Sequence, residues 1–135
     1  RSLRQPLSVM VIQVDGIQHS KPKVERVLDQ TCRAIDAVDV SLINVGAYRR
    51  VLILPSCERQ EAVRFAGAAC RDIGVSLERL GITYDGQDLT VNAGVATVAL
   101  AMKNFRPADL LETAERCVST AQLTGNCVVK SLEIY

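Results

Sequence analysis

The chain has 135 residues, of which 48% are apolar, 23% charged and 4% aromatic, and its formal net charge is +1. This length corresponds to one domain, which can bury a core without a disulfide or a metal to stabilise it. The near-neutral charge argues against binding to duplex nucleic acid, and the few aromatic residues argue against stacking on single-stranded bases. We therefore expect no nucleic-acid partner. The charge balance does not exclude small anionic ligands such as nucleotides.

The five cysteines are an odd number and contain no CxxC pair: Cys32, Cys57, Cys70, Cys117 and Cys127. His19 is the only histidine, so a zinc cluster or a Ser/His triad has little to build on. No apolar stretch reaches the ~18 residues of a membrane span. We expect reduced, buried thiols in a cytoplasmic domain without a signal peptide or membrane contact. The start at Arg1 suggests a piece of a longer protein.

The first half of the chain predicts a strand, a helix and a hairpin. Residues 6–14 (PLSVMVIQV) form a short, β-branched apolar run typical of a buried strand. A polar loop follows, and Pro22 opens a helix. Its apolar positions share one face: Val24, Val27, Leu28, Cys32 and Ile35. Residues 40–45 and 50–54 are strand-like runs around a turn, which predicts a hairpin.

The second half predicts a helix, a second hairpin, a third helix and a last strand. Ser56 is the expected N-cap of a helix that runs to about Ile73, where Gly74 ends it. Residues 82–84 and 89–98 flank Asp85-Gly86, a turn-forming pair. Pro107 opens the third helix and Gly125 closes it, before a strand over residues 127–134. The order β-α-β-β-α-β-β-α-β predicts an α+β domain with helices on a mostly antiparallel sheet.

Four short fragments occur along this order. They are Gln13-Val14-Asp15-Gly16-Ile17; Gly46-Ala47-Tyr48-Arg49-Arg50 with VLILP after it; Asn92-Ala93-Gly94-Val95-Ala96; and AERCVSTAQLTGN over 114–126. They resemble the D-x-D-x-F, G-G-D-E-F, S-x-G-V-A and A-D-x-A-L-Y-x-A-K-x-x-G-R-N motifs of the GGDEF domain, the diguanylate cyclase module of bacterial signalling proteins. The resemblance runs from Pro6 to about Lys130 and implies one palm-like, nucleotide-cyclase-like domain over residues 1–135.

The sequence departs from the family at its metal positions. In active members, the first Asp of D-x-D and the Glu of the signature hold the divalent metals that carry the triphosphate. Here these positions are Gln13 and Arg49. Mg²⁺ prefers anionic oxygens, so an amide is a poor ligand and an arginine repels the ion. The resemblance therefore implies that both metal positions are lost, and with them metal-assisted phosphoryl transfer.

The nucleotide-binding positions are also changed. The family's phosphate-binding Lys and Arg of the closing helix match Gln122 and Asn126. The family's guanine pocket uses an N-D pair, a G-H and a further Asp, where this chain has a shorter segment with only HSKPK over 19–23. We expect no cofactor, no metal and no catalysis.

Two further sites that could bind a ligand are weak. The family's inhibitory R-x-x-D positions fall on Ala37 and Val40, whose side chains do not suit cyclic di-GMP. Arg33 and Asp36 do spell R-x-x-D, but one helical turn too early, and they suggest a local surface ion pair.

Asp15 keeps the second Asp of D-x-D, and we expect it to cap backbone groups of its loop.

The degenerate hairpin offers the best candidates for a partner contact: Tyr48, Arg49 and Arg50. We interpret the two arginines chiefly as solvated turn charges, since neighbouring strand residues point to opposite faces. Tyr48 could anchor a partner, or it could fold back onto the sheet.

Together these features predict a catalytically inactive GGDEF-like regulatory or interaction module of a cyclic di-GMP signalling protein. It would act by dimerisation or by contact with neighbouring domains of the same chain, such as an EAL or a sensory domain. Two alternatives stay open. One is a cyclic di-GMP receptor with a non-standard site, and the other is a residual enzyme with a pocket that holds Asp15 and a second titratable group.

Overall fold

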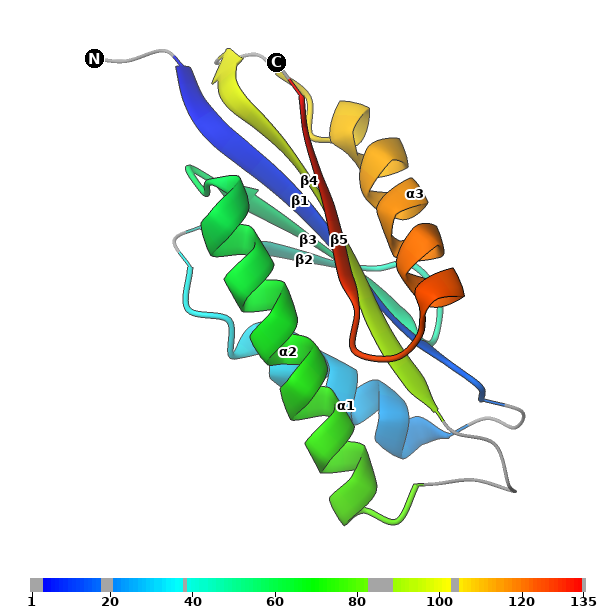
Figure 1. Cartoon of the computed structure of the whole chain (residues 1–135). Coiled ribbons are helices and arrows are strands. Elements are labelled where there is room, and N and C mark those ends of the chain that lie inside the picture. Colours follow the sequence, from blue (N-terminus) through cyan, green and yellow to red (C-terminus); the bar gives the residue numbers. More distant parts are fainter. Residues whose placement is uncertain (1–3, 18–20, 38, 83–88, 103–104, 135) are drawn as a thin grey trace.

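The structure is a computed structural model that describes residues 4–17, 21–37, 39–82, 89–102 and 105–134. Within these ranges, the strands and helices (Figure 1) follow the order β1 (Arg4–Asp15), α1 (Pro22–Arg33), β2 (Ser41–Asn44), β3 (Arg49–Pro55), α2 (Arg59–Arg79), β4 (Thr90–Met102), α3 (Ala108–Thr124) and β5 (Val129–Ile134). The strands form one sheet in the order β2-β3-β1-β4-β5. The α+β class is therefore confirmed.

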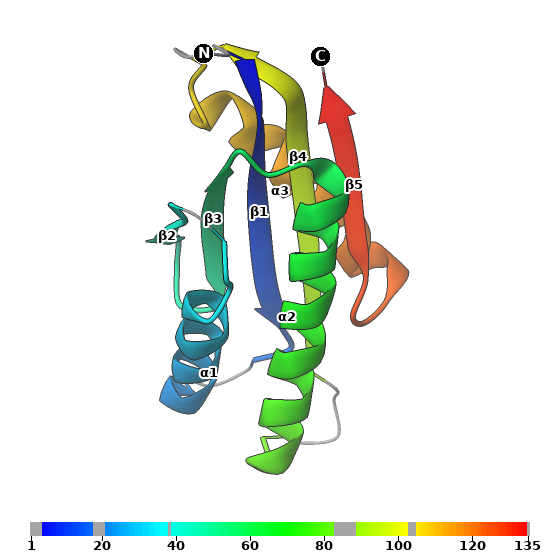
Figure 2. The same ribbon diagram turned by 90° about the vertical axis from the view of Figure 1, so that its left-hand side faces the viewer.

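The sheet is mixed. β1 pairs antiparallel with β3 and with β4, and β2 pairs antiparallel with β3, whereas β5 lies parallel to β4. Helices α1 and α2 cover one face, and α3 lies on the other (Figure 2). The mostly antiparallel sheet that the sequence predicts is confirmed, with one parallel edge strand.

The apolar run of the first strand is explained by its central position in the sheet. Met10, Ile12 and Val14 point into the core under α1 and α2. The alternate residues Val9 and Val11 point into the core under α3. Because both faces of β1 are covered, the strand needs apolar residues at successive positions rather than at every second one.

The second helix is longer than predicted. Gly74 is exposed within α2, and the helix continues to Arg79 because Leu77, which is buried, extends its apolar face by another turn. The left-handed glycine that ends a helix is Gly81, with φ of 65°. The Ile82 amide next to it donates to the Leu77 carbonyl at 3.0 Å. The prediction that Gly74 ends the helix is wrong, since a glycine inside a helix does not stop it when burial continues beyond it.

The expected cap of this helix is also wrong. Ser56 adopts a positive φ of 54° in the turn before α2, and Glu58 takes the N-cap position. The last strand begins at Val129, because Cys127 has a left-handed φ of 58° that interrupts an extended strand. Of the predicted second hairpin, residues 83–88 with the Asp85-Gly86 turn lie outside the described residues, and the second strand is part of β4.

Three of the five free thiols are buried: Cys32, Cys57 and Cys70. Burial raises the pKa of each of these three from 9.0 to about 12. Cys117 is half-buried, and burial raises its pKa as well. Cys127 is exposed. The expectation of buried thiols therefore holds for three cysteines and is wrong for Cys127, which lies in the loop before β5.

We expect a disulfide-forming thiol reagent at neutral pH to modify Cys127 first and Cys117 more slowly. Cys32, Cys57 and Cys70 should react only as the domain unfolds, because only the thiolate is the nucleophile and burial disfavours it. Replacement Cys127→Ser should remove the fast phase of a stopped-flow colorimetric assay. Rapid modification of all five thiols in the folded protein would contradict this order of reactivity.

The three buried thiols also make the stability of the domain depend on pH. Since their pKa values in the folded chain lie above the unfolded value of 9.0, their contribution to the free energy of unfolding is retained below pH 9 and falls as pH rises toward 12.

Within the described ranges, none of the helices combines the length and the apolar character that a membrane crossing requires.

Candidate functional site at the end of the central strand

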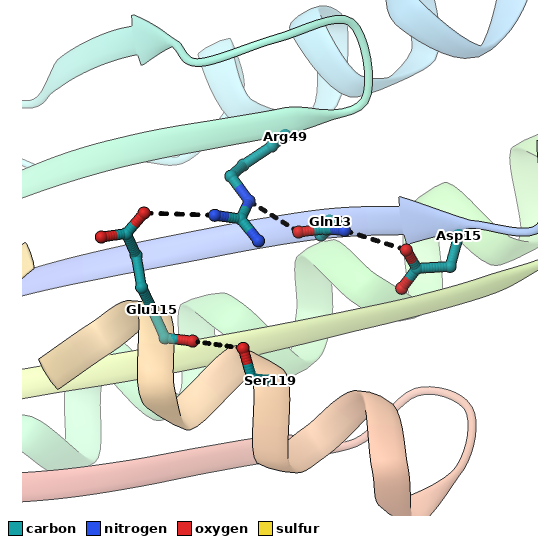
Figure 3. A network of polar contacts seen from close by, with 5 residues as sticks. All are labelled: Gln13, Asp15, Arg49, Glu115 and Ser119. Carbon is teal, nitrogen blue, oxygen red and sulfur yellow. Dashed lines mark hydrogen bonds and ion pairs between the residues drawn. The ribbon is translucent and has the colours of Figure 1, made fainter. Parts of the chain in front are cut away.

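The residues that match the family's metal positions come together at one end of the sheet. Gln13 lies near the end of β1, directly opposite Arg49 at the start of β3. Asp15 ends β1, and Gln122 lies in the last turns of α3. Gln13, Asp15 and Arg49 gather on the α3 side of the sheet (Figure 3), and Gln122 reaches Asp15 from α3, so the sequence identified residues that are neighbours in space.

The guanidinium of Arg49 connects two elements across this site. Its Nε donates to Gln13 Oε1 at 2.6 Å, and its Nη1 lies 3.2 Å from Glu115 Oε2 on α3. The Arg49 and Glu115 side chains are 26% and 39% exposed, so this ion pair is shielded only in part from solvent. Arg49 thus links β3 to both β1 and α3, as Figure 3 shows.

Asp15 is held by side-chain amides. Gln13 Nε2 donates to Asp15 Oδ1 at 2.9 Å, and Gln122 Nε2 donates to Asp15 Oδ2 at 2.6 Å. Among the described residues, both carboxylate oxygens of Asp15 thus accept from side-chain amides. That Asp15 caps backbone groups of its loop stays a prediction, since residues 18–20 of that loop lie outside the described ranges. A shallow hollow of about 350 Å³ beside Asp15 is also lined by Gln13, Tyr48 and Arg49.

This set of groups does not fit a divalent metal. The oxygens at the site are already engaged: Asp15 accepts two amide hydrogen bonds, Glu115 is paired with Arg49, and the oxygen of Gln13 accepts from Arg49. A guanidinium stands where the family has a carboxylate. Among the described residues, no group of three or more His, Cys, Asp or Glu side chains is placed to hold a metal ion. A hard cation prefers anionic oxygens and would be repelled by the guanidinium.

Arg50 is buried, unlike its neighbour Arg49 and unlike the solvated charge that the sequence predicts. It is 1% exposed and lies on the same face of β3 as Leu52, under α1. Its Nε donates to Asp29 Oδ1 of α1 at 2.7 Å. Its Nη1 donates to the carbonyls of Gly46, Ala47 and Arg49 at 2.9, 3.1 and 3.0 Å. The interpretation of Arg50 as a solvated turn charge is wrong, and a side chain this deeply buried is not available for a partner contact.

Tyr48 folds back onto the domain. Its hydroxyl oxygen accepts a hydrogen bond from the Lys21 amide at 2.9 Å, and its half-buried ring packs against the core under α1 and α2. Gly46 supplies the positive φ of 105° that the tight turn requires. Ala47 is exposed at the tip of the hairpin. Of the three hairpin residues proposed for a partner contact, Arg49 and Tyr48 keep only part of their surface in solvent.

Asn126 has a structural role in the loop between α3 and β5. Its Oδ1 accepts from the Val91 amide at 2.8 Å. Asn92, which is fully buried, donates to the Gly125 carbonyl at 3.0 Å and accepts from the Val128 amide at 2.9 Å. The two asparagines tie this loop to the start of β4. Asn126 is the residue that matches the family's phosphate-binding position, and its side-chain oxygen therefore already accepts a hydrogen bond from the backbone.

The positions of the family's inhibitory site carry no charged groups. Ala37 and Val40 are half-buried and pack against the core under α1 and α2. Arg33 is the last residue of α1, and Asp36 lies beyond the helix end. Although both are described, no ion pair joins them, because the i,i+3 spacing holds only within a helix. The expected Arg33–Asp36 ion pair is therefore wrong.

Sequence reasoning missed Asp29 and Glu115. The strand alternation that places Arg50 beside Leu52 and Leu54 could have indicated a buried arginine, which needs a carboxylate partner. Asp29 lies on α1, the helix nearest that face, but nothing local in the sequence pairs it with Arg50. Glu115 stands within the closing-helix motif, yet its contact with Arg49 joins residues 66 positions apart.

Comparisons with solved structures bear on the fold. Neither the models of protein families nor the curated proteins gave a match to the sequence. The active GGEEF domain of a diguanylate cyclase from Vibrio cholerae matches with a TM-score of 0.74 at 16% identity, over 97% of this chain and 85% of that one. The GGDEF domain of DgcB from Caulobacter crescentus, in complex with c-di-GMP, matches with a TM-score of 0.69 at 14% identity, over 93% and 77%.

The same likeness extends to a larger protein. The S helix-GGDEF-EAL portion of LapD from Vibrio cholerae, bound to c-di-GMP, matches with a TM-score of 0.59 at 14% identity. The match covers 93% of this chain and 30% of that one. At such identities the likeness concerns the fold. Over nearly its whole length, the chain has the fold of the GGDEF domain of diguanylate cyclases.

Proposed function

We propose that this chain is a catalytically inactive GGDEF-like module that acts in cyclic di-GMP signalling through contacts with other domains or by dimerisation. The observation that carries the proposal is the Arg49 guanidinium, which stands at the signature position and bonds to Gln13 Oε1 at 2.6 Å. Both family metal positions are thereby engaged with each other. The carboxylates that remain, Asp15 and Glu115, are bonded to side-chain amides and to the guanidinium, so they offer no free pair to hold a metal and its triphosphate.

The phosphate-binding positions support the same proposal. Gln122 is neutral, and its amide donates to Asp15 at 2.6 Å. Asn126 is neutral, and its side-chain oxygen accepts from the backbone of β4. Phosphoryl transfer depends on cations that neutralise the charge developing on the phosphates. No such cation comes from these two positions, and the nearest guanidinium is paired with Glu115.

A regulatory role is supported by what the chain retains. The hairpin turn, the five-stranded sheet and the helices on both faces are present, while the chemistry-bearing positions are substituted. The LapD structure joins a GGDEF domain to an EAL domain in one chain. We propose that this module likewise works beside another domain, to which it transmits or from which it receives a signal.

A product assay tests the loss of catalysis. We expect the chain, incubated with GTP and Mg²⁺ or Mn²⁺, to form no cyclic di-GMP above the level of a protein-free control in liquid chromatography with mass detection. The Vibrio cholerae GGEEF domain, assayed in parallel, serves as the positive control. Formation of cyclic di-GMP that scales with protein concentration would contradict the proposal.

A calorimetric titration with cyclic di-GMP separates this function from the receptor alternative. Because Ala37 and Val40 offer no charge at the inhibitory positions, we expect no saturable heat. Saturable binding would instead favour a receptor with a non-standard site. Sedimentation velocity over a concentration series then distinguishes a module that dimerises from one that contacts neighbouring domains.

A further inference from the structure

We propose that Arg49 is a built-in substitute for a divalent cation, so that the site keeps its shape without metal or nucleotide. This inference builds on the proposed loss of metal binding and adds the means by which the chain compensates for it. Among the described residues, the network of hydrogen bonds at the site includes the carboxylates of Asp15 and Glu115 and the guanidinium of Arg49 (Figure 3). The guanidinium is the one positive charge among these three, and it lies between the elements that carry the oxygens.

The geometry of Arg49 resembles that of a bridging cation. Its Nε and Nη1 reach oxygens on two different elements, Gln13 of β1 at 2.6 Å and Glu115 of α3 at 3.2 Å. Gln13 extends this network to Asp15, because its amide nitrogen donates a hydrogen bond to the Asp15 carboxylate at 2.9 Å. A planar guanidinium with several fixed N–H donors can hold two acceptors at once, which a lysine ammonium does less well.

The network joins three separate parts of the fold. Arg49 opens β3, Gln13 and Asp15 end β1, and Glu115 and Gln122 belong to α3. Gln122 closes the network from the far end of the helix with its 2.6 Å hydrogen bond to Asp15. Without a positive charge at position 49, Glu115 would lose its partner and Gln13 Oε1 its donor. We infer that the site then needs an external cation.

Melting temperatures measured with and without Mg²⁺ test this inference, with NaCl at matched ionic strength as the reference. The native chain should show no difference between the two salts. Arg49→Glu should melt about 5 °C lower in NaCl, because a like-charge contact with Glu115 replaces an ion pair. Mg²⁺ should restore at least half of this loss, since the variant brings carboxylates together without a guanidinium between them.

Arg116→Glu is the matched control. Arg116 lies on the same helix and pairs with Glu112 at 2.9 Å, but both side chains are far more exposed, at 72% and 78%. The variant makes the same change of charge next to a glutamate, at a side chain that takes no part in the hydrogen bonds of the network. We expect Mg²⁺ to act on it no more than matched NaCl does.

Arg49→Gln keeps the test decisive if Arg49→Glu does not fold. It removes the charge without adding a like-charge contact, and it should gain a smaller but measurable Mg²⁺-dependent rise in melting temperature. Two outcomes would overturn the inference: a Mg²⁺-dependent rise in the native chain, or the absence of any such rise in both Arg49 variants. Neither outcome touches the product assay, so failure of this inference and failure of the proposed function remain distinguishable.

Discussion

Replacing Gly94 with alanine is expected to lower the free energy of unfolding by about 3 kcal/mol, close to the upper end for an overpacked core. Gly94 lies in β4 where α3 crosses it. A Cβ atom there would come within 2.3 Å of the Ala114 carbonyl oxygen and of the Val118 amide nitrogen. It would also come within 2.8 Å of Cys117 Cβ.

The contacts at Gly94 explain why the loss should be large. Two of the three clashing atoms are backbone atoms of α3, so no side-chain rotation can relieve them. The helix must move away from β4, and the packing of Ala114 and Val118, both fully buried, would loosen with it. Urea denaturation monitored by circular dichroism measures the effect.

Gly74→Ala is the matched control for this substitution. Gly74 is exposed within α2, and a Cβ there would meet nothing within 4 Å. Alanine in a helix interior is more favourable than glycine, so this variant should gain about 0.5–1 kcal/mol. A Gly94→Ala variant as stable as the native chain would contradict the close packing of α3 on β4.

Removing the carboxylate of Asp29 should have the second-largest effect. Asp29→Ala leaves the Arg50 guanidinium, whose side chain is 2% exposed, without its charged partner. Breaking a buried ion pair by removing one member typically costs 3–5 kcal/mol. Because the Asp29 side chain is 26% exposed and water can reach the gap, we expect a loss of about 2–3 kcal/mol in urea denaturation.

A double-mutant cycle shows whether this loss comes from the stranded charge. Arg50→Met removes the charge while it keeps an unbranched apolar chain in the same space. Once Arg50 is Met, Asp29→Ala should cost much less, so the double variant should lose less stability than the two single variants summed. The exposed pair of Arg116 and Glu112 is the control, and Arg116→Ala should cost less than about 0.5 kcal/mol. Strict additivity at Asp29 and Arg50 would contradict their coupling.

The elements that the sequence predicts best are those with a strong apolar pattern. The first strand, α1 and α3 follow directly from residues that need burial on one or two faces. The length of α2 was harder to predict, because Gly74 resembles a helix end unless the burial of Leu77 is known. The parallel pairing of β5 with β4 depends on where α3 returns the chain, which no local pattern specifies.

The candidate site, like the fold, could be predicted from the sequence only in part. The positions Gln13, Arg49, Gln122 and Asn126 could be located from motif order, and three of them meet in space. Their partners could not be predicted, since Glu115 reaches Arg49 only through the packing of α3 on the sheet. Arg50 shows the limit of reading charge as exposure: its alternation with Leu52 and Leu54 predicts burial, whereas its charge alone predicts solvent.

Titration of the chain with GTP in the presence of Mg²⁺, followed by isothermal calorimetry, tests most directly whether the nucleotide site is lost. The Arg49 guanidinium at the signature position and the neutral Gln122 and Asn126 predict no saturable heat. Saturable, Mg²⁺-dependent binding of GTP at micromolar concentration would show that the nucleotide site is retained and would contradict its proposed loss.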